Sequence, residues 1–253
     1  VVGPLMVYLD RFVIAAVLTL GAVTYYVIPY EIAVRFLVFP VAIAGVLFPA
    51  FATALVFNRV RVGEMFNRTI NVISLIMLPM MGIVILFAPE GLALWLGDDA
   101  NPQSVDVMQC LAVGVFMNAL ARFPFSLLQS AGRADLIAIM HLSELPVYLS
   151  ALYYLLLEFG IVGAAIAWTI RAGIDAVLLF FATVKLVPEA KSGALSALLL
   201  MVGAVTILIL LAIPAPLVLK LSIALIGVLA SAGFLWREIR DLDWMRSLAG
   251  SRL

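Results

Sequence analysis

The sequence predicts an all-α fold, a polytopic membrane helix bundle of about eight transmembrane helices, and three observations support this. Of the 253 residues, 66% are hydrophobic and only 12% are charged, whereas soluble domains have roughly 45–50% apolar and about 25% charged residues. The mean hydropathy is +1.22. The apolar residues form runs near the roughly 20 residues that a helix needs to cross a bilayer, without the period-two alternation of membrane strands.

Eight apolar runs meet or approach this length, and short connectors with charges, Gly or Pro separate them. The first run is already apolar at Val1, so we expect the chain to be a piece of a longer protein, cut within a transmembrane helix. No connector is long enough for a domain outside the membrane. The predicted spans are 1–20, 26–57, 70–96, 105–130, 136–159, 162–186, 194–213 and 217–236.

Basic residues gather in alternate connectors, which predicts the orientation of the chain. Connectors 58–68, 131–135 and 185–193 and the C-terminal tail contain Lys or Arg, whereas 19–29, 97–103, 158–163 and 214–216 contain none. Short cytoplasmic loops are enriched in Lys and Arg, so both chain ends are predicted to be cytoplasmic. The tail from residue 237 is expected either to lie along the inner membrane surface as an amphipathic helix or to be a frayed helix end.

Composition and motifs exclude several function classes. The formal net charge is zero, so no overall field favours nucleic acid as a partner. The single cysteine, Cys110, excludes a disulfide framework and a multi-cysteine metal site. The sequence also lacks G-x-x-x-x-G-K-[ST], G-x-S-x-G and H-E-x-x-H motifs. We therefore expect no cofactor and no metal.

Several ionisable residues fall inside the predicted spans, where a charge costs roughly 2.5–3.5 kcal/mol at the bilayer centre. Such residues usually face a bundle interior or a water-filled cavity, and they indicate a transport pathway. They are Asp10, Arg11, Glu31, Arg35, Arg122, His141, Glu144, Arg171 and Asp175.

Two acid–base pairs have the four-residue spacing of neighbours on one helix face. Glu31 and Arg35 form one, with the acid first, and Arg171 and Asp175 form the other. Each pair is predicted either to neutralise itself within its helix or to line a cavity. The sequence alone does not choose between these two alternatives.

The remaining charges lack such a local solution. Asp10 and Arg11 project about 100° apart on a helix, so at least one needs a partner on another helix or a wet cavity. Arg122 has no acid three or four residues away and lies close to Pro124, where a helix bends. His141 and Glu144, three residues apart, are expected to form either a proton relay or a simple hydrogen-bonded contact.

Three blocks of the sequence carry a wider pattern: PLMVYLDRFVIAAVL at 4–18, AVTYYVIPYEIAVRFLVFPVAIAGVLFPAFA at 22–52, and residues 128–180 with LQSAGRAD and GIVGAAIA. In this order and spacing they resemble bacterial polysaccharide-biosynthesis flippases of the multidrug/oligosaccharidyl-lipid/polysaccharide exporter superfamily. The resemblance covers most of residues 1–186. It implies a fold of two lobes around a central cavity, with twelve or fourteen helices. Residues 1–186 would form the second lobe, with about six spans and the first truncated, and 187–253 an additional helix pair and the cytoplasmic tail.

The resemblance also implies a function in the bacterial cytoplasmic membrane. The substrate would be a polyprenyl-pyrophosphate-linked oligosaccharide, flipped without covalent chemistry, so the protein would be a transporter and not an enzyme. Its other partners would be membrane lipid, the missing N-terminal lobe and other polysaccharide-assembly proteins. Arginine binds phosphate anions well, so the expected substrate-binding residues are Arg11, Arg122, Arg171 and Arg35. The expected coupling or structural-pair residues are Asp10, Glu144, Asp175, His141 and Glu31.

Three alternatives remain open at this point. A cation-coupled multidrug antiporter of the same superfamily would use the acids Asp10, Glu144 and Asp175 to receive a cation. A membrane-embedded glycan enzyme would use His141 and Glu144, although no connector provides the usual extracytoplasmic site. A non-transporting structural bundle is the third, and the unpaired charges within the spans argue against it.

Overall fold

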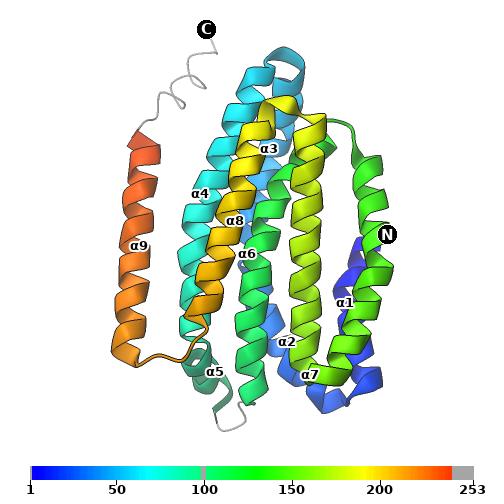
Figure 1. Ribbon diagram of the computed structural model, residues 1–253, viewed down its shortest axis with the longest axis vertical. Helices are drawn as coiled ribbons and strands as arrows, with labels where there is room; N and C mark the ends of the chain where they lie inside the picture. Colours follow the sequence, from blue (N-terminus) through cyan, green and yellow to red (C-terminus); the bar gives the residue numbers. More distant parts are fainter. Residues whose placement is uncertain (1, 98–100, 241–253) are drawn as a thin grey trace.

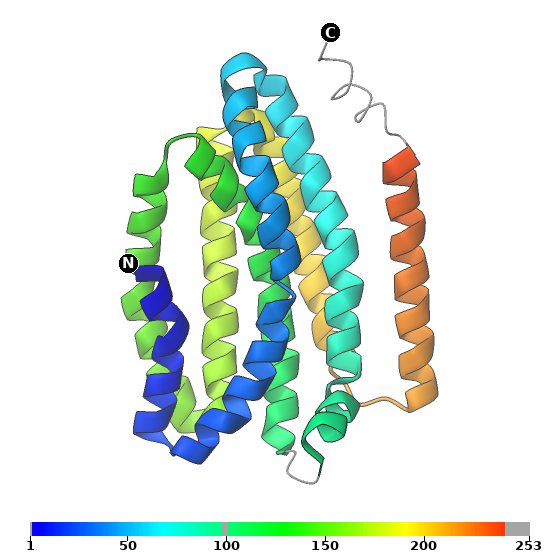
Figure 2. The ribbon, with the colours of Figure 1, turned by 180° about the vertical axis from the view of Figure 1, so that it is seen from behind.

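The computed structural model describes residues 2–97 and 101–240, and within these residues it contains helices and no strands (Figures 1 and 2). The prediction of an all-helical, polytopic bundle is therefore confirmed. The elements are α1 (Val2–Val17), α2 (Leu20–Arg35), α3 (Val38–Phe57), α4 (Arg59–Leu86), α5 (Ala88–Leu96), α6 (Pro102–Ser130), α7 (Ala134–Leu186), the 3-10 helix η2 (Pro188–Ala190), α8 (Lys191–Leu211) and α9 (Leu217–Arg240).

Six helical segments in the described part of the chain are long and apolar enough to cross a membrane: α3, α4, α6, α7, η2 with α8, and α9 up to Trp236. Helices α1 and α2 have 16 residues each, fewer than the roughly 20 that a straight span requires. Helix α7, with 53 residues, is one of these six segments, although it reverses direction at Gly160 and therefore has two arms. The structure thus supports a membrane bundle, with fewer candidate spans than the eight predicted runs.

The reversal in α7 lies between two predicted spans. Gly160 has φ 58° and ψ −141°, a left-handed conformation that favours glycine. Gly163 follows where the second arm begins, and a Cβ there would lie 1.9 Å from the carbonyl oxygen of Leu155. The two glycines allow a sharp turn, and Figures 1 and 2 show α7 as a hairpin of two antiparallel arms. The predicted connector 158–163 is therefore a helical bend.

The predicted single span 26–57 is wrong in its continuity. The chain breaks between α2 and α3, where Phe36 and Leu37 donate their backbone N–H groups to the carbonyls of Ala33 and Val34, in the tighter 3-10 pattern. Pro40 follows in the first turn of α3 and has no N–H to continue the helical pattern. The proline therefore explains why the apolar run bends, although hydrophobicity continues through it.

The predicted connector 58–68 and the span 70–96 also require correction. Helix α4 begins at Arg59, directly after Asn58, whose side chain accepts a hydrogen bond from the N–H of Arg61. The charged stretch is thus helical. Charged residues show where a helix leaves the apolar layer of the membrane, but they do not end the helix. At the other end, the run divides at Phe87 into α4 and the short α5, which has Pro89 near its start. The predicted amphipathic tail lies largely outside the described residues.

Helix α6 is the centre of the bundle. In its most apolar stretch 83% of the residues are buried, against 6% in α9. It packs against both arms of α7 and against α2, α3 and α4. Gly114 lets the second arm of α7 approach, since a Cβ there would lie 2.6 Å from the Trp168 ring. Close approach at small residues is typical of helix packing in membranes.

The turns of the bundle lie at two opposite ends (Figures 1 and 2). The α3–α4 and α6–α7 turns and η2 share one end, where Arg59, Arg133 and Lys191 lie. The α1–α2 turn, α5, the α7 bend and the α8–α9 connector share the other end. The basic connectors therefore gather at one end of the bundle, as the alternation in the sequence predicts.

Candidate functional site

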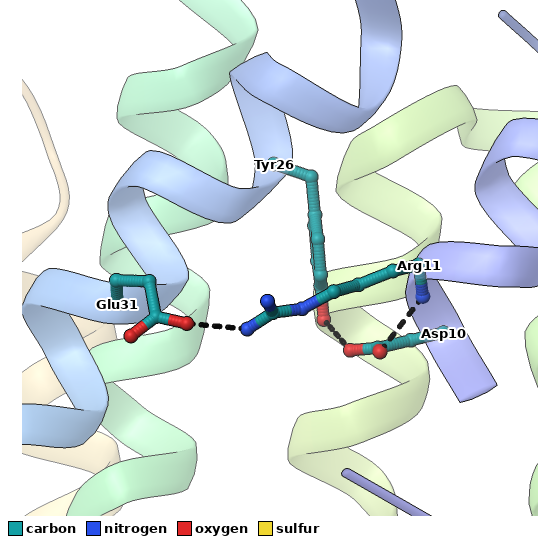
Figure 3. A network of polar contacts seen from close by, with 4 residues as sticks. All are labelled: Asp10, Arg11, Tyr26 and Glu31. Atoms are coloured by element: carbon teal, nitrogen blue, oxygen red, sulfur yellow. Dashed lines mark hydrogen bonds and ion pairs between the residues drawn. The ribbon is translucent and has the colours of Figure 1, made fainter. Parts of the chain in front are cut away.

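The adjacent charges of α1 have separate partners on α2 (Figure 3). Asp10 is buried, with 1% of its surface exposed. It accepts a hydrogen bond of 2.8 Å from the Tyr26 hydroxyl and another from the backbone N–H of Arg11. A buried carboxylate needs such donors to offset the loss of water. Asp10 therefore ties α1 to α2.

Arg11 extends beyond Asp10 toward α2 and forms a salt bridge with Glu31 through Nη2 (Figure 3). Its guanidinium also lies 5.4 Å from the centre of the Tyr30 ring, within the range of a cation–π contact. Tyr30 and Glu31 of α2 thus both contact Arg11 of α1. Of the two alternatives for Glu31 and Arg35, the pair within the helix is not formed, because Glu31 pairs with Arg11 instead. Arg35 is exposed at the end of α2 and forms no salt bridge within the described residues.

A cavity of about 460 Å³ lies among α1, α2, α6 and α7. It brings together six of the nine residues that the sequence predicts for the site and leaves out Asp10, Arg35 and Glu144. Its lining residues are Arg11, Tyr30, Glu31, Val34, Leu37, Asn118, Ala121, Arg122, Phe125, His141, Trp168, Arg171, Asp175 and Leu179.

Two of the cavity arginines have no carboxylate partner within the described residues. Arg122 of α6 forms no salt bridge or hydrogen bond there, and its Nε is buried. Arg171 of α7 places its guanidinium 5.4 Å from the centre of the Tyr148 ring, and its Nε is also unbonded. Of the two alternatives for Arg171 and Asp175, the structure therefore supports the cavity: both residues line it, and no salt bridge joins them within the described residues. Arg122 and Arg171 are available to an anion in the cavity.

Asp175 instead contacts a residue on the other arm of α7. Its Oδ1 lies 3.2 Å from Nε2 of His141. The His141 ring stacks on Phe125 of α6, with ring centres 6.2 Å apart. Asp175 thus fixes His141 across the hairpin. Of the two alternatives for His141 and Glu144, the hydrogen-bonded contact is not formed, and the proton relay stays a prediction. The helical spacing of three residues was outweighed by a partner on a neighbouring arm.

Glu144 lies outside the main cavity and lines a smaller, mostly apolar pocket of about 190 Å³ between the two arms of α7. It is 6% exposed. Neither of its carboxylate oxygens has a hydrogen-bond partner within the described residues, and neither does the hydroxyl of Tyr148. Glu144 therefore lies outside the main cavity, although Arg171 lines both spaces.

Some residues that line the cavity are not among the site residues predicted from the sequence. Asn118 lies one helical turn before Arg122 and shares its face, and its Oδ1 is buried and unbonded within the described residues. The four-residue spacing could have indicated this. Tyr30 and Trp168 meet edge-to-face at 5.9 Å and form an aromatic wall. No sequence signal distinguishes such aromatics from core residues, because their contact joins two distant segments.

The charge balance of the cavity decides what it can bind. Three arginines face two carboxylates, Glu31 and Asp175, and His141 is neutral or positive. The carboxylates are engaged by Arg11 and His141. The excess is therefore positive and is carried by Arg122 and Arg171. Guanidinium groups bind phosphate oxygens in pairs of parallel hydrogen bonds, so this arrangement suits a phosphate-bearing anion.

Two comparisons with known proteins found similar sequences. Residues 1–99 match the model of a family described as "Polysaccharide biosynthesis protein". This part of the chain is therefore similar to the polysaccharide biosynthesis family. The matched residues include α1 and α2, and therefore the contacts of Asp10 and Arg11.

A curated relative extends the similarity along the chain. A Shigella flexneri protein named "Putative O-antigen transporter" is 34% identical over 179 residues, which is 71% of this chain and 42% of the relative. The chain thus spans less than half the length of that relative. No solved structure matches the chain. The chain is thus similar to a polysaccharide biosynthesis family and to a protein named as an O-antigen transporter, and it contains helices that are long and apolar enough to cross a membrane.

Proposed function

We propose that the chain is part of a membrane transporter that flips a polyprenyl-pyrophosphate-linked oligosaccharide across the bacterial cytoplasmic membrane for surface polysaccharide biosynthesis. The observation that carries this proposal is the cationic cavity, in which Arg122 and Arg171 lack carboxylate partners within the described residues. The homology to an O-antigen transporter supports the lipid-linked glycan as substrate. Flipping requires no bond to be made or broken, so the chain has no catalytic role in this proposal.

In this proposal the chain crosses the membrane eight times. Helices α2 and α3 together form one bent span, the arms of α7 form two, and α1, α4, α6, α8 and α9 form the others. Residues 1–186 act as the second lobe of the transporter, residues 187–253 as an additional helix pair with its tail, and the first lobe completes the cavity. The other partners are membrane lipid and further polysaccharide-assembly proteins.

The proposed orientation places the basic end of the bundle in the cytoplasm. Cysteine substitutions at Gln103 and at Arg133, introduced into the complete protein after removal of its native cysteines, test this with a membrane-impermeant thiol reagent. We expect the Gln103→Cys variant to label in intact cells and the Arg133→Cys variant to label only after the membrane is opened. The reverse pattern would contradict the orientation.

The transport proposal predicts that Arg122→Ala in the complete protein lowers outer-leaflet delivery of the lipid-linked glycan by about tenfold or more. Loss of one charge-assisted contact costs roughly 1.5–3 kcal/mol, which corresponds to that range. Arg122→Lys should restore delivery only partly, because an ammonium lacks the planar fork of a guanidinium.

Delivery is measured relative to the amount of transporter in the membrane. Full delivery by the Ala variant would refute the anion site. If delivery and protein abundance fell in proportion, Arg122 would instead be a structural residue that ties helices together.

The antiporter alternative requires an acid that binds a proton or cation. His141 with Asp175, and Glu144 in its own pocket, are the candidates for such coupling in the proposed transporter. Replacing each with a neutral residue in the complete protein should change how transport depends on the ion gradient. Unchanged dependence in all three variants would remove these residues from coupling.

A further inference from the structure

The salt bridge between Arg11 and Glu31 differs from the contact beside it. The Asp10–Tyr26 hydrogen bond is buried. In the salt bridge, by contrast, 23% of the Arg11 side chain and 46% of the Glu31 side chain are exposed, and both residues line the cavity. An ion pair open to water is weak, because solvent screens it and its long side chains lose freedom when they pair. The two contacts between α1 and α2 therefore differ in how easily they exchange partners.

We propose that Glu31 is an internal competitor of the anionic substrate: its carboxylate occupies Arg11 in this conformation, and a phosphate oxyanion displaces it. This inference rests on the proposed function of the cavity. Displacement frees the guanidinium for two parallel hydrogen bonds to phosphate oxygens. The return of Glu31 to Arg11 then helps to release the anion.

The surroundings allow this exchange without unfolding α1. Asp10 keeps its buried bond to Tyr26, so α1 remains tied to α2 when Arg11 changes partner. The Tyr30 ring lies beside the Arg11 guanidinium, 5.4 Å from centre to carbon, and limits the space that the group can sample. A small change of side-chain conformation is therefore sufficient.

The other cavity cations draw the anion to the same place. Arg122 and Arg171 line the cavity with Arg11 and have no carboxylate partner within the described residues. A phosphate or pyrophosphate group bound by these two arginines brings further oxyanions into competition with Glu31. The ligand class is a phosphate ester or pyrophosphate, and its source is either a lipid head group or a soluble phosphate compound.

A double-mutant cycle on the complete protein in detergent tests this inference. Calorimetric titration with inorganic pyrophosphate measures the dissociation constant for the wild type, Glu31→Gln, Arg11→Gln and the double variant. We expect Glu31→Gln to tighten binding by about two- to fivefold, the range of an exposed ion pair. In the Arg11→Gln background, the same substitution should have no effect, because the competition acts through Arg11.

Two control variants complete the experiment. Glu64→Gln removes an exposed carboxylate of α4 that does not line the cavity, and it should leave binding unchanged. Glu31→Ala should act in the same direction as Glu31→Gln, so either variant can report the effect if the other does not fold. Vesicles containing polyprenyl pyrophosphate replace the soluble probe in a second arm. If Glu31→Gln binds these vesicles more tightly than the wild type does, the site takes the lipid head group. If it binds only inorganic pyrophosphate more tightly, the site takes a soluble anion.

The inference is overturned if Glu31→Gln and Glu31→Ala bind pyrophosphate no more tightly than the wild type. It is also overturned if Glu31→Gln still tightens pyrophosphate binding in the Arg11→Gln background. Glu31 would then act only through the overall negative charge that it adds to the cavity. Arg122→Gln separates this result from the proposed function. Loss of binding in that variant with no effect of Glu31 retains the anion site and rejects the competition, whereas unchanged binding in that variant rejects the anion site itself.

Discussion

The two sides of the bundle use the same apolar composition in different ways. Around α6, helices α1, α2 and α7 enclose a cavity whose lining includes three arginines. On the other side, α9 packs mainly on α4, and 6% of the residues in its apolar stretch are buried. The buried carboxylates Asp10, Glu144 and Asp175 lie where several helices pack together, whereas α9 has few neighbours and leaves most of its apolar stretch exposed. The number of neighbouring helices, more than hydrophobicity, thus separates a site from a lipid-facing wall.

The largest expected loss of stability tests whether the helices around α6 are packed more tightly than α9. Gly163→Ala places a Cβ against the carbonyl of Leu155, and main-chain atoms cannot move aside as a flexible side chain can. We expect a loss of about 3 kcal/mol or more, at the upper end for overpacked sites, with little folded protein in the membrane. Thermal unfolding in detergent and membrane abundance measure this.

Gly227→Ala is the matched control on α9. A Cβ there meets no atom within 4 Å, so the substitution should not destabilise the fold, and the higher helix propensity of Ala could add up to about 1 kcal/mol of stability. Equal loss of stability in the two variants would show that the two sides are packed alike.

A smaller effect is expected where α9 is held by charge. Lys220 is 8% exposed and donates a hydrogen bond of 2.7 Å to Glu90 of α5. This contact, at the end of the bundle without basic connectors, lowers the pKa of Glu90 below its ordinary value of 4.5. A depressed carboxyl pKa stabilises the fold above the unfolded pKa, and this stabilisation is lost as the pH falls through the lower, folded pKa.

Lys220→Met should therefore cost about 0.2–1 kcal/mol at neutral pH, because Glu90 is half-exposed and its ion pair is screened. The difference between variant and wild type should shrink below pH 4.5, where Glu90 becomes protonated. Unfolding midpoints across this pH range measure it. A difference that stays constant with pH would mean that Lys220 contributes by packing alone.

The sequence predicted the fold better than the contacts within the site. Hydrophobic runs and basic connectors indicate spans and ends of the bundle, because both depend on local composition. Helical spacing left a local partner and a cavity role as alternatives for Glu31, Asp175 and His141, and each contacts a residue on another helix or on the other arm of α7. Such contacts depend on how distant segments pack. The bend at Phe36 had a local signal in Pro40, whereas the separation of Arg35 from the cavity had none.

Arg35 and Arg122 provide the most direct test of the central claim, that the cavity arginines form an anion site. The sequence places both in the substrate-binding set, but only Arg122 lines the cavity. We predict that Arg122→Ala weakens pyrophosphate binding to the complete protein by about tenfold or more, whereas Arg35→Ala leaves the dissociation constant within about twofold of the wild type. Equal weakening by both variants, or weakening by Arg35→Ala alone, would contradict the account.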